Sequence, residues 1–174
     1  MAHLALMTIG LLHGPAGDPR VQGFFDGIAA NFAAADASPG LVLRIGAEGA
    51  PDGGPRALPV AFSDPTYAGR LPQTLSVWRD LESAFAFTYR NVHGEALTDR
   101  HAWFVKLDFS SHVAWWLEVG VVPTWAASAE RFDRLVAQGP SPEAFTFRVP
   151  FDAAGHEYRI DREVVRRLAG PASR

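Results

Sequence analysis

The fold is decided by residues 75–104, which read LSVWRDLESAFAFTYRNVHGEALTDRHAWF. Residues 75–78 are mostly apolar and include β-branched and aromatic types, a composition typical of a short strand. Asp80 then occupies the position of a helix N-cap, because apolar residues recur every three or four positions after it. The pattern predicts a helix whose apolar face packs on a sheet and contains Leu81, Ala84, Phe85, Thr88, Tyr89 and Val92.

Three reactive side chains follow one another along the same helix edge. If the helix continues past Gly94, steps of four and three residues place Tyr89, His93 and Arg100 on one side. We therefore predict them as catalytic residues. His93 would act as a general base, because an imidazole titrates near neutral pH, and Tyr89 or Arg100 would stabilise an oxyanion. The alternatives are simple packing for Tyr89 and a backbone hydrogen bond at a helix junction for His93.

Length and composition exclude several classes of protein. The 174 residues suffice for one well-buried core. The net charge of -3 and the scattered Lys and Arg residues favour no nucleic-acid partner. With no cysteine, the chain has no disulfide, thiolate zinc site, iron–sulfur cluster or cysteine nucleophile, which fits a reducing, cytoplasmic location. The six histidines show no HxH or HExxH spacing, so no dedicated metal site is expected.

The first residues are predicted to form a strand. Residues 4–12 are an almost unbroken apolar run, as in a strand that is covered on both faces. The start of the chain lacks the basic region and the small-residue cleavage site of a signal peptide. No segment approaches the roughly 18 to 20 apolar residues of a membrane helix, so no membrane partner is expected.

A helix is predicted to begin at Asp18 and Pro19. Its apolar stripe is assigned to Val21, Phe25, Ile28 and Phe32, and its outward face to Gln22, Asp26 and Asn31. A second strand follows at residues 41–45, where Arg44 either faces solvent or lines a polar cavity. Residues 46–73 are dense in glycine and proline and predict a long loop, which either covers a binding site or is an insertion without consequence.

The rest of the chain adds two strands, a helix and a charged tail. Residues 112–120 alternate so that Trp116 and Glu118 share one face of a strand. A helix capped by Thr124 follows, and a last strand is predicted at residues 145–149.

The order of these elements predicts a ferredoxin-like α+β fold, with an antiparallel sheet and helices on one face. Residues 1–150 would form this single domain, with the long loop at 46–73, and residues 151–174 would form a C-terminal extension. The uncovered face of the sheet would need a partner. A homodimer that joins two sheets into one barrel would supply it.

Several motifs occur in an order that resembles a known family: SVW, YRNVH, RHAWF, the WW pair, VPTWAASAERFDRL and GPSPEAFTF. Over about residues 3–149, the chain resembles an uncharacterised domain-of-unknown-function family in the dimeric α+β barrel superfamily, alongside the antibiotic-biosynthesis monooxygenases. That superfamily includes cofactor-independent monooxygenases and cyclases of aromatic, polyketide-like substrates, and haem-binding or haem-degrading enzymes. In the haem-degrading members, a histidine late in the helix after the strand tryptophan binds iron. Here Leu97 falls near that position, and His93 and His101 lie one turn to either side.

The resemblance implies a small-molecule biosynthetic enzyme that oxygenates or cyclises an apolar aromatic or polycyclic substrate, held between helices and sheet, without a bound cofactor. The candidate substrate-binding residues are Trp78, Trp103, Trp116, Glu118 and Arg44. Tryptophans also fill cores and dimer interfaces, and a carboxylate on a strand also suits solvent. Two alternatives stay open: a haem enzyme with His93 or His101 as axial ligand, and a non-catalytic ligand-binding accessory dimer.

Overall fold

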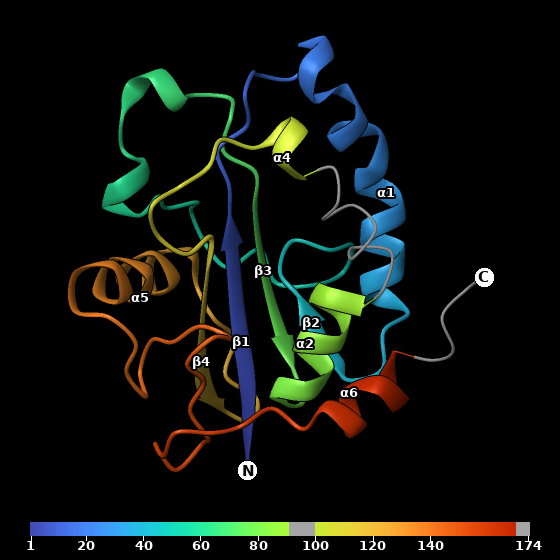
Figure 1. Cartoon of the computed structure of the whole chain (residues 1–174), viewed down its shortest axis with the longest axis vertical. Coiled ribbons are helices and arrows are strands. Elements are labelled where there is room, and N and C mark those ends of the chain that lie inside the picture. Colours follow the sequence, from blue (N-terminus) through green and yellow to red (C-terminus); the bar gives the residue numbers. More distant parts are fainter. Residues whose placement is uncertain (91–99, 170–174) are drawn as a thin grey trace.

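The computed structural model describes residues 1–90 and 100–169, with Arg90, Arg100 and His101 described by their backbone alone. The chain forms a four-stranded sheet in the order β2-β3-β1-β4, and each neighbouring pair is antiparallel (Figure 1). The strands are β1 (Ala2–Ile9), β2 (Leu41–Arg44), β3 (Gln73–Trp78) and β4 (His112–Glu118). This sheet and the helices packed on it confirm the predicted ferredoxin-like α+β fold.

The described helices include the three that were predicted to begin at Asp18, Asp80 and Thr124. The helices are α1 (Gln22–Asp36), α2 (Leu81–Arg90), α4 (Arg100–Trp103), α5 (Trp125–Gln138) and α6 (Arg162–Leu168), with the 3-10 turns η1 (Pro19–Val21), η2 (Val60–Phe62) and η3 (Pro65–Tyr67). In residues 1–90 and 100–169, no helix is both long and apolar enough to cross a membrane.

Three predicted helix starts are confirmed by the side chains that cap them. Ahead of α2, the carboxylate of Asp80 accepts a hydrogen bond from the N–H of Ser83 at 2.7 Å. Ahead of α5, the hydroxyl of Thr124 accepts one from the N–H of Ala127. Asp18 caps η1, which leads directly into α1. Each cap satisfies an N–H that the first turn leaves without a backbone partner.

One face of the sheet is covered by α5 and by the segment between β2 and β3. This core contains Ala5, Met7, Ile9, Leu75, Val113 and Trp115 from the strands, Trp125, Phe132 and Leu135 from α5, and Phe62 from η2. The indole N–H of Trp125 donates to the carbonyl of Asp52 at 2.8 Å, which ties the long segment to α5. The expectation of a bare sheet face is therefore corrected, because the chain's own α5 covers it. The homodimer stays a prediction, but a bare sheet face no longer supports it.

The opposite face carries the predicted helical layer. Its core joins Leu4, Leu6 and Trp78 of the sheet to Leu81, Ala84 and Phe85 of α2, Phe145, Phe147, and Val165 of α6. In this layer α6 packs against α2 (Figure 1). Glu82 of α2, which is 7% exposed, accepts hydrogen bonds from the hydroxyl of Tyr158 and the N–H of Asp161, both at 3.0 Å. The tail is thereby fastened to the main domain.

The predicted last strand at residues 145–149 is wrong. Phe145 exchanges two backbone hydrogen bonds with Ala114 of β4, which makes a single bridge. The N–H of Val149 then bonds to the carbonyl of Thr146, so the backbone turns instead of continuing along β4. From this turn, Phe145 and Phe147 both pack into the core on the α2 side of the sheet.

Candidate functional site

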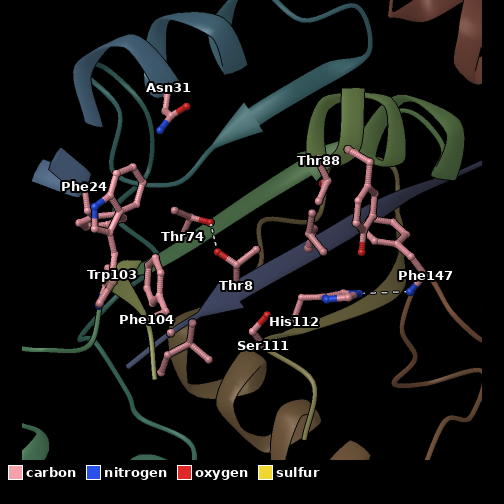
Figure 2. A pocket seen from close by; sticks show the side chains of 15 residues that line it. Thr8, Phe24, Asn31, Thr74, Thr88, Trp103, Phe104, Ser111, His112 and Phe147 are labelled. Atoms are coloured by element: carbon pink, nitrogen blue, oxygen red, sulfur yellow. Dashed lines mark hydrogen bonds between the residues drawn. The ribbon is translucent and has the colours of Figure 1, made fainter. Parts of the chain in front are cut away.

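A cavity of about 170 Å³ lies between the helical layer and the sheet (Figure 2). Because its walls come from α1, α2, α4 and the ends of three strands, it occupies the place between helices and sheet where a ligand was expected. The side chains and backbone that line it belong to Leu6, Thr8, Ile9, Gly10, Phe24, Asn31, Pro72, Thr74, Thr88, Tyr89, Trp103, Phe104, Ser111, His112 and Phe147.

Two threonines form the polar part of the cavity floor. Thr8 of β1 lies directly opposite Thr74 of β3 in the antiparallel register, so both side chains leave the sheet on the same face. Their hydroxyl oxygens are 2.7 Å apart and share one hydrogen bond. Further along the same face of β1 the side chains are Leu4 and Leu6, so the hydroxyl pair marks where the apolar core gives way to the cavity.

Aromatic rings close one end of the cavity. The ring of Phe24 on α1 meets the ring of Phe104 edge-on, with centroids 5.2 Å apart, and that of Trp103 at 6.3 Å. The carbonyl of Trp103 accepts a hydrogen bond from the N–H of His13, which holds this segment against the chain after β1. Gly10 lies under the Phe104 ring, where any added Cβ would overlap it. These contacts hold the aromatic wall between two segments that are far apart in the sequence, residues 10–24 and 103–104.

His112 stands at the other end of the cavity and is bonded on both ring nitrogens. Its Nε2 accepts a hydrogen bond from the backbone N–H of Phe147 at 3.2 Å, and its Nδ1 lies 3.3 Å from the hydroxyl of Ser110. Since Ser110 donates its own proton to the His112 carbonyl, its oxygen is placed to accept from Nδ1–H in the tautomer whose Nε2 is the acceptor. His112 therefore holds the chain at Phe147 against β4. The lone pair of its Nε2 already accepts the N–H of Phe147.

Asn31 of α1 reaches into the cavity, contrary to the sequence prediction. Figure 2 shows its amide above the Thr8–Thr74 pair, with the aromatic rings on one side and His112 on the other. Its Oδ1 is buried and has no hydrogen-bond partner among the described residues. The inward face of α1 contains Val21, Phe24, Ile28, Asn31 and Ala35, a spacing of three, four, three and four.

This spacing is present in the sequence, but the polar Asn31 was assigned to the outward face and the spacing was therefore not recognised. The predicted stripe ended instead at Phe32, whose side chain is 37% exposed and lies under the guanidinium of Arg44. The inward face thus keeps Val21 and Ile28 of the predicted stripe, but Phe24 and Asn31 line the cavity in place of Phe25 and Phe32.

Comparison with known proteins identifies the family. A family model described as a domain of unknown function, DUF3291, matches residues 3–161. The chain belongs to the DUF3291 family. The comparisons found no match among curated proteins or solved structures. The DUF3291 match extends past the cavity to Asp161, the residue whose N–H is held by Glu82, so the family region includes the fastened tail.

Only part of the predicted catalytic group can be located in this DUF3291 chain. Tyr89 lines the cavity, with its ring 4.5 Å from Phe85 and 5.9 Å from Phe147, and is 41% exposed. His93 lies outside the described residues, and so does the side chain of Arg100. The grouping of Tyr89 with His93 and Arg100 therefore stays a prediction.

The three candidate tryptophans have different places. Trp103 lines the cavity, and its contact with a substrate stays a prediction. Trp78 is 1% exposed, stacks on Phe87 and donates its indole N–H to the hydroxyl of Ser76. Trp116 donates its indole N–H to the carbonyl of Phe151. Trp78 and Trp116 are thus engaged in packing away from the cavity lining.

Neither charged candidate lines the cavity. Arg44 makes a two-bond ion pair with Asp36 at the end of α1, and its guanidinium holds the pKa of that carboxyl below its usual range. Glu118 is exposed at the end of β4. Among the described residues, no group of three His, Asp or Glu side chains is placed to hold a metal ion.

Proposed function

We propose that this DUF3291 protein binds a small, mostly apolar molecule, about the size of one aromatic ring, in the cavity between α1, α2 and the sheet. The observation that carries the proposal is the cavity itself, which combines an aromatic wall with a few hydroxyl and amide groups. Ligand sites in proteins have this composition, because apolar walls supply affinity and a few polar groups fix orientation.

The size of the cavity favours one ring over several. A cavity of about 150 Å³ in another protein is known to hold benzene, whereas drug-sized ligands occupy roughly 300 to 1,000 Å³. The cavity here, at about 170 Å³, belongs with the first case. Of the two substrate classes implied by the family resemblance, a single aromatic ring therefore fits better than a polycycle.

We propose no haem in this cavity. A porphyrin contains four pyrrole rings, and the residues that line the cavity leave room for about one ring. The histidines considered as axial ligands are His93, which lies outside the described residues, and His101, described by its backbone alone. A Soret absorption band in the purified protein would contradict this view.

The chemical step, oxygenation or cyclisation without a bound cofactor, is a finer proposal within the same site. It is supported by Tyr89 in the cavity wall, which can donate to a developing oxyanion. The base would be His93, since the lone pair of His112 is occupied by Phe147. Because His112 has no lone pair left to take a proton from a ligand, its hydrogen bond with Phe147 also favours the alternative function, a protein that binds a ligand without catalysis.

The placement of the family in the dimeric α+β barrel superfamily is likewise a proposal. It is supported by the β2-β3-β1-β4 strand order and by the two helices α1 and α2 on one side of the sheet. Light scattering at micromolar concentration would test the associated homodimer.

Binding is tested with p-xylene and p-cresol, two single-ring molecules of nearly equal shape. The readouts are the fluorescence of tryptophan, since Trp103 lines the cavity, and the melting temperature. A matched variant, Thr88→Phe, fills the cavity from α2, where the Thr88 hydroxyl bonds only within its own helix. We expect saturable binding of at least one probe in the wild type and its loss in Thr88→Phe. Absence of binding, or equal binding by the filled variant, would overturn the proposal.

If binding is found, catalysis can be examined separately. His93→Asn and His93→Ala should lower conversion of the native substrate by at least about tenfold, since general bases contribute about 10² to 10⁴-fold to rate. Unchanged conversion would remove His93 as the base and leave the binding function intact.

A further inference from the structure

If the cavity binds a single-ring ligand as proposed above, we infer that the hydroxyl pair of Thr8 and Thr74 donates one hydrogen bond to that ligand. The ligand would then be a ring that carries a hydrogen-bond acceptor, such as a carbonyl or hydroxyl oxygen. The inference rests on the proposed function and names the chemical class of its ligand.

The threonine pair lies on the cavity floor, in the middle of the sheet. Thr8 of β1 is opposite Thr74 of β3 on one side and His112 of β4 on the other, so the three residues form one row across the sheet. Both threonines are partly exposed and line the cavity. Since β1 is paired with a strand on each side, the exposed part of Thr8 is its side chain. Figure 2 shows the pair between the aromatic rings and His112.

The two hydroxyls have one proton more than they use. Each hydroxyl can donate one proton and can also accept. The hydrogen bond between their oxygens, at 2.7 Å, takes one of the two protons, and either residue can supply it. No other hydrogen bond joins these hydroxyls to a described residue. A donor enclosed without an acceptor is unfavourable, whereas an unused lone pair is tolerated more easily. The pair is therefore suited to an acceptor atom on a bound molecule.

The surroundings of the pair provide both a place for the ring and a control residue. Two residues after Thr8, Gly10 has no side chain, and the ring of Phe104 lies over it. A ligand ring that packs against Phe104 can direct its oxygen toward the threonines. Thr88 of α2 lines the same cavity, but it donates its proton to the carbonyl of Ala84 at 2.8 Å. Thr88 thus has a hydroxyl without a proton for the ligand.

The test compares two probes of nearly equal shape: p-tolualdehyde, whose oxygen only accepts, and p-xylene, which has no polar atom. Calorimetry measures their dissociation constants with the wild type, Thr8→Val, Thr74→Val, the double variant Thr8→Val/Thr74→Val, and Thr88→Val. Valine has nearly the shape of threonine, and replacing both partners of a hydrogen bond leaves neither one unpaired. The quantity compared is the preference, which is the dissociation constant of p-xylene divided by that of p-tolualdehyde. Comparing this ratio between variants cancels the different hydration of the two probes.

We expect the preference to be at least about fivefold higher in the wild type than in the double variant, which lacks the proton. Thr8→Val and Thr74→Val should each stay within about twofold of the wild type, because the remaining hydroxyl still has a proton to donate. Thr88→Val should also stay within about twofold, whatever the change in the separate constants. A double variant with the wild-type preference would overturn the inference and leave the ring-binding cavity standing. So would an equal fall in either single variant or in Thr88→Val.

Infrared spectroscopy provides a second readout that needs no variant. The carbonyl stretch of p-tolualdehyde bound to the wild type should lie at a lower wavenumber than in hexane, because a hydrogen bond weakens the C=O bond. A stretch at the hexane position would overturn the inference. Failure of both probes to bind the wild type would instead overturn the proposed function. If Thr8→Val/Thr74→Val does not fold, Thr8→Ala/Thr74→Ala takes its place.

Discussion

The backbone N–H of Phe147 donates a hydrogen bond to Nε2 of His112, at 3.2 Å. The two rings also lie against each other, with centroids 4.9 Å apart. This pair connects β4 to a stretch of chain 35 residues later that forms no regular strand, and it completes one end of the cavity.

Replacing His112 with Phe should lower the free energy of unfolding by about 1 to 3 kcal/mol, because the N–H of Phe147 then becomes a buried donor without an acceptor. Chemical denaturation measures the loss. His156→Phe serves as the control, since the side chain of His156 is 79% exposed, and it should change stability little. Equal effects of the two substitutions would show that the imidazole of His112 contributes nothing specific.

Asp80 should make the stability of the protein depend on pH. Burial raises the pKa of this carboxyl, but hydrogen bonds from Ser83 and Arg79 outweigh burial, and the pKa lies below its ordinary value of 3.8. Because the folded-state pKa is lowered, the contribution is present above about pH 4 and is lost as the pH falls further. Asp80→Ala should cost about 0.5 to 2 kcal/mol at neutral pH, and the difference from the wild type should shrink as the pH falls below about 4. A difference that does not change with pH would contradict this account.

Glu82 should control the attachment of the C-terminal tail. Its carboxylate accepts from Tyr158 and Asp161, and hydrogen bonds to a charged group contribute about 1.5 to 3 kcal/mol each. Glu82→Ala should therefore speed tryptic cleavage at Arg159 and Arg162, as followed by mass spectrometry. Glu163→Ala, on the exposed side of α6, is the control and should not. Unchanged cleavage in Glu82→Ala would mean that apolar contacts alone hold the tail.

Tyr158 provides a second pH dependence, at the alkaline end. Burial first, and then the hydrogen bond and negative charge of Glu82, raise the pKa of its phenol above 10.0. The folded state thus keeps the proton, so the contribution to stability is present below about pH 10 and is lost as the pH rises through the folded-state pKa. Absorbance titration should show one phenol that ionises late in the wild type and earlier in Glu82→Ala. Titration of all three tyrosines at their ordinary pH in the wild type would contradict this expectation.

Replacing Gly10 or Gly27 with alanine should change the stability of the protein in opposite directions. Gly10→Ala places a Cβ in the ring of Phe104, so we expect a loss of about 1 to 3 kcal/mol and weaker binding of p-cresol and p-xylene alike. Gly27→Ala, inside α1, meets only Nδ2 of Asn31 at an ordinary 3.8 Å and should stabilise by about 0.5 to 1 kcal/mol. Thermal unfolding with and without the probes separates the two cases. A neutral Gly10→Ala would show that the aromatic wall can shift without cost.

Much of the fold could be predicted because it depends on neighbouring residues. Asp80 lies three residues from the N–H that it caps, and Thr124 stands in the same relation to Ala127. The alternation of β4 and the apolar runs of β1 and β3 follow from the two-residue period of a strand. These signals suffice to order the elements, and the order favours one sheet topology.

The cavity could be predicted only in outline. Trp103 and Tyr89, both candidates from the sequence, line the cavity, and their roles there stay predictions. Asn31 was missed because a polar residue on a helix is ordinarily assigned to solvent, and the Thr8–Thr74 pair because it joins two strands far apart in the sequence. His112 was not among the candidates, because its partner Phe147 is far away in the sequence.

By itself, the sequence determined the helix caps, the strand periods and therefore the ferredoxin-like α+β class. Only the tertiary structure decided which way α1 is rotated, that α5 and the segment between β2 and β3 cover the second sheet face, and that Phe147 reaches His112. The physical reason is the range of the interactions. Caps and periods act within about four residues, whereas the orientation of a helix and the burial of a polar group depend on contacts between residues that are distant in the chain and meet only in the packed core.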